Sequence, residues 1–241
     1  MIFVTSWDDG HPLDERLGDL LDRFGLKATF FVPIRNREGR PVLSTDALRR
    51  LDGRFEIGSH TLDHIPLTGL PQAECARQIA EGKAALEQQV GHVVPGFSYP
   101  RGKWNAPVRD AVLKAGCNYA RTIENFRLDP GSDRFSVPTT RQIFPHGRHV
   151  LLWNYFQYGN HISRFKALTT SLKSRNWRDF LVKLIDTNLE ESSVLHVWGH
   201  SWEIEEQELW TELEGLFSVI ASTHPKPFTI NELVAGTMRS Q

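Results

Sequence analysis

Short runs of β-branched and aromatic residues alternate along the chain with longer amphipathic runs. Within 72–90, Ala76, Ile79, Leu86 and Val90 fall on one stripe at helical spacing, with polar residues opposite. Runs rich in β-branched and aromatic residues, bounded by turn residues, are typical of strands. The pattern predicts strands at 2–7, 28–32, 55–59, 96–99, 117–122, 150–154 and 194–200, and helices at 12–24, 45–51, 72–90, 106–115, 163–173, 178–190 and 206–221.

Strands that alternate with helices predict parallel pairing and an α/β fold. Because no glycine-serine linker, internal repeat or low-complexity stretch interrupts the alternation, we expect one domain over 1–241. The segment 123–149 differs from the rest, since it is rich in Asp, Pro, Gly and Arg and has weak periodicity. A loop of this length in a compact domain is often functional, so we expect it to form the rim of a site.

The composition is that of an ordinary globular protein, with 40% hydrophobic and 24% charged residues. A formal net charge of -1 provides no field to attract DNA or RNA, so a nucleic-acid partner is disfavoured. No apolar run approaches the ~20 residues that span a bilayer, and no signal peptide precedes the first strand. If the chain is complete, a cytoplasmic protein is expected. Cys75 and Cys117 lie outside any Cys/His cluster and are interpreted as reduced, packed thiols.

Polar side chains cluster where the predicted strands end. Asp8 and Asp9 end the first strand, His60 follows the strand at 55–59, Arg101 follows the strand at 96–99, and His200 ends the strand at 194–200. Sites in parallel α/β folds form at the carboxyl ends of the strands. The sequence therefore predicts that these groups share one site.

The pair His60 and His64 is spaced to bind a metal. Residues i and i+4 on a helical turn lie on the same face, so two imidazoles can converge on one ion. With Asp9 as a third ligand, positions remain open for water and substrate, as in a catalytic site. Zn²⁺ fits these ligands best, while Co, Ni and Mn are also possible. Taken singly, the histidines are equally well ordinary helix-start residues, and Asp-Asp-Gly is often a turn.

These motifs resemble those of the polysaccharide deacetylase (NodB-homology, carbohydrate esterase) family. Its T-F-D-D-G motif is similar to Ser6-Trp7-Asp8-Asp9-Gly10, and its H-[ST]-x-x-H motif is met in full by the run from His60 to His64. The resemblance covers roughly 1–120 and 190–204. It implies a distorted (β/α) barrel with about seven parallel strands, Asp8 as general base, and Asp9, His60 and His64 as metal ligands.

The third family motif departs from the usual pattern. It commonly reads R-x-P-Y, with an arginine that orients the base, whereas this chain has Ser98 at that place in a run that ends Tyr99-Pro100-Arg101. Another cation is therefore needed beside Asp8. The candidates are Arg141, Arg121 and Arg101, each of which is otherwise a solvated surface arginine.

The last motif ends in a histidine that acts as general acid, and two histidines compete for that role. His196 and His200 have the same parity along an extended strand. His200 lies nearer the carboxyl end and begins a run similar to the H-x-W-E ending of some members, so it is preferred. Substrate-contacting or supporting roles are expected for Tyr99, Arg101, Arg141, His196 and Trp202.

The resemblance implies a metal-dependent hydrolase that removes an N-acetyl group from a sugar or glycan precursor. A divalent metal lowers the pKa of its bound water towards ~7, and a histidine can protonate the leaving amine. The partner is then a carbohydrate or another small molecule. Two alternatives remain: a metal-dependent hydrolase of another small amide or cyclic ureide, and a non-catalytic carbohydrate-binding protein on the same fold.

Overall fold

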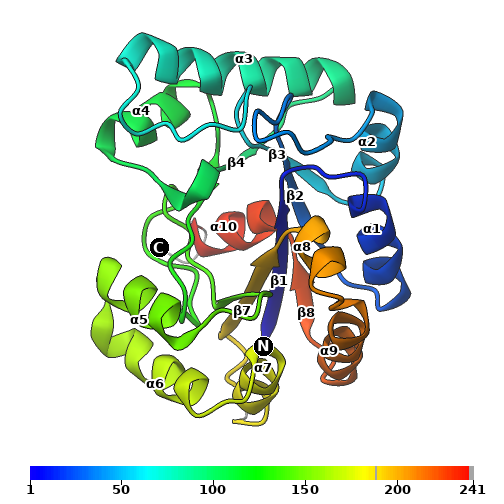
Figure 1. The fold of residues 1–241 in the computed structure, drawn as a ribbon, viewed down its shortest axis with the longest axis vertical. Helices are drawn as coiled ribbons and strands as arrows, with labels where there is room; N and C mark the ends of the chain where they lie inside the picture. Colours follow the sequence, from blue (N-terminus) through cyan, green and yellow to red (C-terminus); the bar gives the residue numbers. More distant parts are fainter. Residues whose placement is uncertain (188, 239–241) are drawn as a thin grey trace.

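The computed structural model describes residues 1–187 and 189–238, and its centre is a parallel sheet with helices packed around it (Figure 1). Every strand pairing in the sheet is parallel. The strands are β1 (Ile2–Asp8), β2 (Thr29–Val32), β3 (Glu56–Ser59), β4 (Gly96–Ser98), β5 (Tyr119–Arg121), β6 (Arg141–Gln142), β7 (Val194–Gly199) and β8 (Lys226–Phe228).

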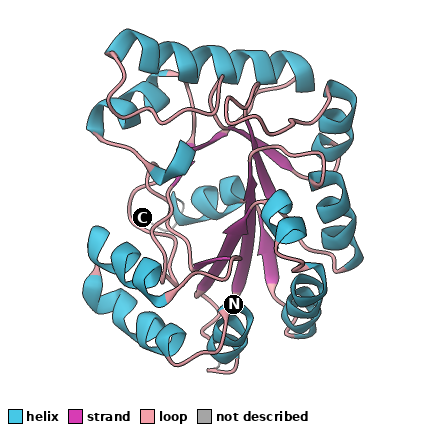
Figure 2. Cartoon of the chain, in the orientation of Figure 1, coloured by secondary structure: helices cyan, strands magenta, loops and turns pink. Residues whose placement is uncertain are grey.

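Helices follow most of the strands and surround the curled sheet (Figure 2). Within the described residues, every helix is too short or too polar to cross a lipid bilayer. The helices are α1 (Asp14–Arg23), α2 (Thr45–Asp52), α3 (Gln72–Val90), α4 (Ala106–Lys114), α5 (Arg148–Gln157), α6 (His161–Leu172), α7 (Trp177–Ile185), α8 (Ser201–Glu206), α9 (Trp210–Ser222) and α10 (Ile230–Met238), with a 3₁₀ turn η1 at Pro100–Gly102.

The strand order β5-β4-β3-β2-β1-β7-β6 makes a curled half-barrel. β1 lies at its centre and pairs with β7 from Ile2 to Trp7. Its other edge is shared, because β8 pairs with its first residues and β2 with its last. Six of the seven β1 residues are buried, as expected for a strand covered on both faces. The predicted α/β fold, a distorted barrel of about seven parallel strands, is confirmed.

The gap between β5 and β6 is bridged by part of the segment predicted as a loop. Val137 forms an isolated parallel bridge with Arg121, and its N–H donates to the Ala120 carbonyl at 2.9 Å. The Thr140 N–H donates to the carbonyl of His196 on β7 at 2.7 Å. The segment 123–149 is therefore more than a rim, because it links the two ends of the sheet and contains β6.

The strand predicted at 150–154 is wrong, because these residues lie in α5. The run Val150-Leu151-Leu152-Trp153 is apolar enough for a buried strand, but its burial follows a helical period. Leu151, Asn154 and Tyr155 are buried, whereas Trp153 is 71% exposed. The strand β8 and the helix α10 were not predicted from the sequence pattern.

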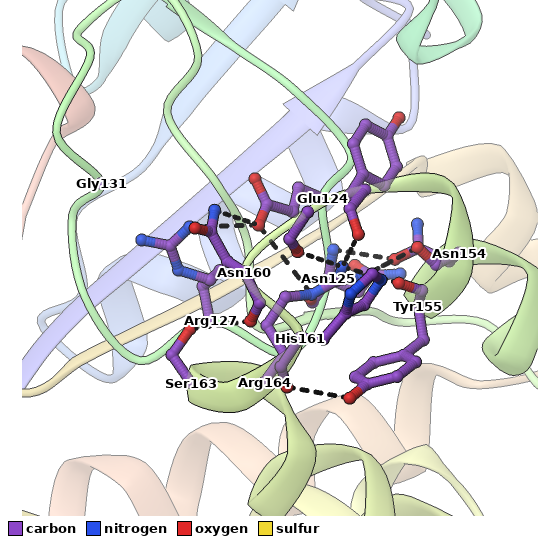
Figure 3. A network of polar contacts seen from close by, with 12 residues as sticks. Glu124, Asn125, Arg127, Gly131, Asn154, Tyr155, Asn160, His161, Ser163 and Arg164 are labelled. Carbon is purple, nitrogen blue, oxygen red and sulfur yellow. Dashed lines mark hydrogen bonds and ion pairs between the residues drawn. The ribbon is translucent and has the colours of Figure 1, made fainter.

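A buried arginine fastens α5 and α6 to the bridging segment (Figure 3). The Arg164 side chain is fully buried, and its guanidinium donates to the backbone carbonyls of Asn125, Asn154, Tyr155, Tyr158 and Gly159. It also donates to the Asn154 Oδ1 at 2.9 Å. Buried carbonyls need donors, and one planar guanidinium supplies several in a fixed geometry. Arg164 therefore holds the α5–α6 turn against the segment that follows β5.

Candidate active site

The ends of β1, β3 and β7 open into one pocket of about 190 Å³. Local backbone strain accompanies the turns that follow β1, β3 and β4, because Asp9, Thr61, His64 and Arg101 all have positive φ angles, from 52° to 79°. Such strain in residues other than glycine is concentrated at functional sites. The pocket is lined by Asp8, Asp9, Glu38, His60, His64, Arg101, Gly102, Ile123, Trp198, His200 and Trp202.

The two oxygens of the Asp9 carboxylate have different surroundings. Oδ2 accepts a hydrogen bond from the Trp202 indole Nε1 at 2.9 Å, which fixes the orientation of the group. Oδ1 lies 3.0 Å from His64 Nε2 and 3.7 Å from His60 Nε2. This buried Oδ1 has no aligned hydrogen-bond partner among the described residues. One oxygen is therefore held in place while the other faces the two imidazoles.

The His60 ring is oriented by its second nitrogen. The His60 Nδ1 lies 2.8 Å from the Ser98 carbonyl, which can only accept, so Nδ1 carries the proton and Nε2 presents a lone pair. Such a contact is typical of metal-binding histidines. The His64 Nδ1 has no hydrogen-bond partner among the described residues and lies 3.7 Å from a carboxylate oxygen of Glu38, while the His64 backbone N–H donates to Thr61 Oγ1 at 3.0 Å.

These three residues fit a divalent cation. One ligand atom from each lies within 4.8 Å of the others, and all three side chains are buried. Burial would raise the pKa of the Asp9 carboxyl, but the His64 contact and neighbouring histidines outweigh it and hold this pKa far below its ordinary value. Burial lowers the pKa of His60 to about 4, whereas for His64 the contact with Asp9 outweighs burial and raises the pKa. A deprotonated carboxylate and a neutral imidazole are the forms that bind metal.

Asp8 faces Arg121 across the barrel. The Arg121 guanidinium donates to Asp8 Oδ1, and both side chains are almost completely buried. Ser98, which stands where the family has its arginine, contacts Asp8 Oδ2 only weakly, at 3.5 Å. Burial would raise the pKa of Asp8, but Arg121 and two nearby histidines keep it below its ordinary value. Of the three arginines proposed from the sequence, the structure places Arg121 against this carboxylate.

His200 lies in the pocket and contacts a carboxylate from the next helix. Its Nδ1 is 2.6 Å from Glu203 Oε2 on α8, and that oxygen also accepts from the Gln142 side chain at 3.0 Å. Burial would lower the pKa of His200, but Glu203 and the two aspartates raise it to about 9. Glu203 is the last residue of the H-x-W-E run, and its contact with His200 was not predicted, although its i+3 spacing from His200 is a usable signal.

Three residues expected near substrate lie outside this pocket. Tyr99 is buried, donates to the Phe135 carbonyl at 3.0 Å and stacks on Trp104. His196 is buried in the barrel between Ser6 Oγ, at 2.9 Å, and the Pro138 carbonyl, at 2.8 Å. Arg141 points to a second cavity. His196 lies inside β7, four positions before His200, so it sits deeper in the barrel than the pocket at the strand end.

The other two expected residues line the pocket. Arg101 pairs with Glu38 at 2.7 Å, and Trp202 donates to Asp9 and lies under the Arg40 guanidinium.

Asp63, inside the second motif, supports the loop and does not line the pocket. Its carboxylate contacts Arg35, Arg37 and the Gln78 amide, which fixes the loop between His60 and His64.

Comparison with known proteins matches this chain to deacetylases. The polysaccharide deacetylase family model matches residues 2–120. The peptidoglycan-N-acetylglucosamine deacetylase of Listeria monocytogenes is 31% identical over 113 residues, which cover 45% of this chain and 23% of that protein. The chitin deacetylase of Pestalotiopsis sp is 35% identical over 100 residues, which cover 41% of this chain and 33% of that protein. The matches thus span no more than a third of these two relatives.

Among solved structures, the fold is similar to a family 4 acetyl xylan esterase from Clostridium thermocellum in complex with a cobalt ion. The TM-score is 0.60 at 15% identity, over 98% of this chain and 91% of the esterase. At that identity the likeness shows the fold and not the activity. The family model, the two relatives and the two motifs at the strand ends lead to one conclusion: this chain belongs to the polysaccharide deacetylase (NodB-type carbohydrate esterase) family.

Proposed function

We propose that this protein is a metal-dependent hydrolase that removes an N-acetyl group from a sugar or glycan precursor. The observation that carries the proposal is the asymmetry of the two adjacent aspartates. Asp9 directs an unpartnered carboxylate oxygen at His60 and His64, while Asp8 contacts Arg121 instead. One aspartate is thereby suited to hold a cation and the other to accept a proton.

Asp9, His60 and His64 would hold the divalent ion, with zinc as the expected metal. When bound, such an ion lowers the pKa of water and polarises a carbonyl oxygen. Asp8 accepts a proton from the attacking water, because its depressed pKa keeps it ionised at neutral pH. The Arg101 backbone N–H, on the pocket wall, is the candidate donor to the developing oxyanion.

His200 donates a proton to the leaving amine. Its raised pKa keeps the imidazole protonated at neutral pH, and Glu203 holds the ring through Nδ1 so that Nε2 is free to reach the substrate. His196 is unsuited to this step, because burial lowers its pKa to about 3 and both of its ring nitrogens are engaged.

The test is acetate release from a panel of N-acetylated sugars by metal-loaded protein. N-acetylglucosamine, its oligomers, its 1-phosphate and a nucleotide-linked form would be compared with small free amides and cyclic ureides. Acetate from at least one sugar, with no turnover of the other amides, is the expected result. Asp8→Asn protein with unchanged metal content serves as the control for contaminating activity.

The pocket volume of about 190 Å³ also admits a small free amide or cyclic ureide, so that class is the second candidate. Turnover confined to such compounds would replace the sugar proposal and leave the metal assignment intact. If the protein binds no divalent metal and releases no acetate, it is a non-catalytic member of the fold.

A further inference from the structure

A second cavity, of about 310 Å³, lies between β6 and the helices α5, α6 and α7. These helices gather on one side of the sheet (Figure 1). The groups that line the cavity are basic or neutral, and the described part of its wall holds no carboxylate. The wall consists of Arg141, Pro145, His146, Gly147, Arg148, Leu151, Ser171, Ser174, Arg175, Asn176 and Trp177.

Arg141 is the most informative residue in this wall. Its side chain is 3% exposed, and two of its guanidinium nitrogens, Nε and Nη1, are buried with no hydrogen-bond partner among the described residues. Burial lowers its pKa to about 10, and no neighbouring acid opposes that effect. A buried charge without a partner is costly, so the folded protein has a reason to take up an anion here.

One helix N-terminus reinforces the positive character of the cavity. α5 begins after Gly147, which lines the cavity and has no side chain to cap the first N–H groups. At α7, by contrast, the Asn176 side chain already accepts from the Asp179 N–H. Unsatisfied N–H groups at the start of a helix, together with the helix dipole, favour bound oxyanions.

The local charge of the chain agrees with this reading. Between Asp133 and Asp179 the sequence holds no Asp or Glu, although the whole chain has a formal net charge of -1. The positive charges at the mouth of the cavity are Arg148 and Arg175, both exposed. Asp179, the first acid after this stretch, is paired with Lys183 at 2.8 Å and also accepts from the Arg175 backbone N–H at 2.9 Å.

We propose that this cavity binds a phosphate or diphosphate group. Arg141 supplies planar, paired N–H donors from the floor, Arg148 and Arg175 supply charge at the mouth, and the start of α5 supplies backbone N–H groups. A guanidinium matches the geometry of phosphate oxygens, and the volume holds one or two phosphoryl groups.

The cavity is linked to the pocket described above by side-chain hydrogen bonds. His146 Nε2 lies 2.7 Å from Gln142 Oε1, and Gln142 Nε2 donates to the Glu203 oxygen that contacts His200. This link suggests that the phosphate belongs to a phosphorylated sugar whose acetamido group reaches His200. That extension rests on the proposed function, whereas phosphate binding itself does not.

The first experiment measures binding of inorganic pyrophosphate by isothermal titration calorimetry. The metal-loaded protein is compared with Arg141→Met and with Arg148→Gln/Arg175→Gln, whose exposed positions avoid a folding defect. We expect the affinity for pyrophosphate to fall at least tenfold in both variants, and to be unchanged in Lys166→Gln, an exposed control on α6.

His60→Ala protein separates this cavity from the metal centre, because pyrophosphate binding to the cavity should survive in that variant. Absent binding, or binding lost only in His60→Ala, overturns the proposal.

The second experiment tests the source of the phosphate. Acetate release is compared for N-acetylglucosamine and its 1-phosphate, and binding is compared for a soluble nucleoside diphosphate sugar and for phosphatidylcholine vesicles containing a polyprenyl phosphate. The lipid arm is included because Trp153, Phe156 and Ile162 on α5 and α6 are exposed and can contact a lipid chain. The physiological source is the compound whose binding or turnover falls more in the Arg148→Gln/Arg175→Gln protein.

The two proposals fail in distinguishable ways. Pyrophosphate binding without acetate release from any sugar leaves the phosphate site standing and removes the deacetylase. Acetate release with equal KM for both sugars, and no pyrophosphate binding, removes the phosphate site and leaves the deacetylase.

Discussion

Arg121 and Asp8 form a buried ion pair although they stand 113 positions apart in the chain. Arg121 ends β5 and Asp8 ends β1, and the curl of the sheet brings these two side chains into contact. The guanidinium also lies 4.7 Å from the Trp198 ring centroid. We propose that Arg121 takes the place that the family resemblance gives to the third-motif arginine, from a different strand.

Arg121→Met is expected to raise the pKa of Asp8, because burial then acts without its opposing charge. Asp8 must be ionised to accept a proton, so the acid limb of kcat/KM should move to higher pH. Removing one partner of a buried pair costs about 3–5 kcal/mol of stability at neutral pH. Arg121→Lys should restore part of both effects. A lower kcat with an unmoved pH profile would show that Arg121 has only a structural role.

His60→Ala and Asp8→Asn should separate metal binding from proton transfer. His60→Ala removes one of three ligands, so we expect metal content after dialysis to fall well below one ion per chain. Asp8→Asn removes the base and should keep full metal content while turnover falls at least a hundredfold. Elemental analysis and acetate release measure the two. Full metal retention by the His60→Ala protein would contradict the ligand assignment.

Glu203→Gln tests whether the carboxylate tunes His200. The folded-state pKa of His200 is raised to about 9, so its stabilising contribution is complete below 6.5 and is lost as pH rises through about 9. As general acid it must be protonated, and the alkaline limb of kcat reports its pKa. Without the Glu203 charge this limb should shift to lower pH, and the stability lost above neutral pH should diminish. An unchanged alkaline limb with reduced kcat would indicate positioning alone.

The sequence predicted the parts of the site that depend on local spacing. Asp9, His60 and His64 belong to two short motifs at strand ends, and strand ends in a parallel fold converge. Arg121 was only one of three candidate arginine partners for Asp8, because the direction of its side chain depends on how β5 is placed against β1. The strand predicted at 150–154 failed for a related reason. Apolar composition alone does not separate a strand from a helix whose exposed face carries Trp153.

Asp14 is expected to reduce stability at neutral pH. It lies fully buried on α1, neither carboxyl oxygen has an aligned hydrogen bond among the described residues, and burial raises its pKa well above 3.8. A raised folded-state pKa gives a contribution to stability that is present below 3.8 and lost as pH rises through the folded value.

Asp14→Asn removes this titration while keeping the shape of the side chain. In metal-free protein, we expect urea unfolding to show a gain in stability that is larger at pH 7 than at pH 4. Asp110→Asn, an exposed position on α4, should show no such dependence. An equal effect of Asp14→Asn at both pH values would mean that burial does not raise the pKa of this carboxyl.

Arg164 should be among the most sensitive positions for stability outside the pocket (Figure 3). Arg164→Met keeps the apolar stem but leaves several buried carbonyls without a donor, which costs on the order of 3 kcal/mol. For a chain of this size, Tm should then fall by roughly 6–12 °C. Lys166→Met, two residues along the exposed side of α6, is the matched control and should leave Tm within about 1–2 °C, because surface substitutions change stability by roughly 0.5 kcal/mol or less. The Arg164 contacts hold the α5–α6 turn beside the second cavity and do not hold the proposed metal ligands. The metal content of the Arg164→Met protein should therefore be unchanged at temperatures below its Tm. Loss of metal with no fall in Tm would place Arg164 in the site and not in its support.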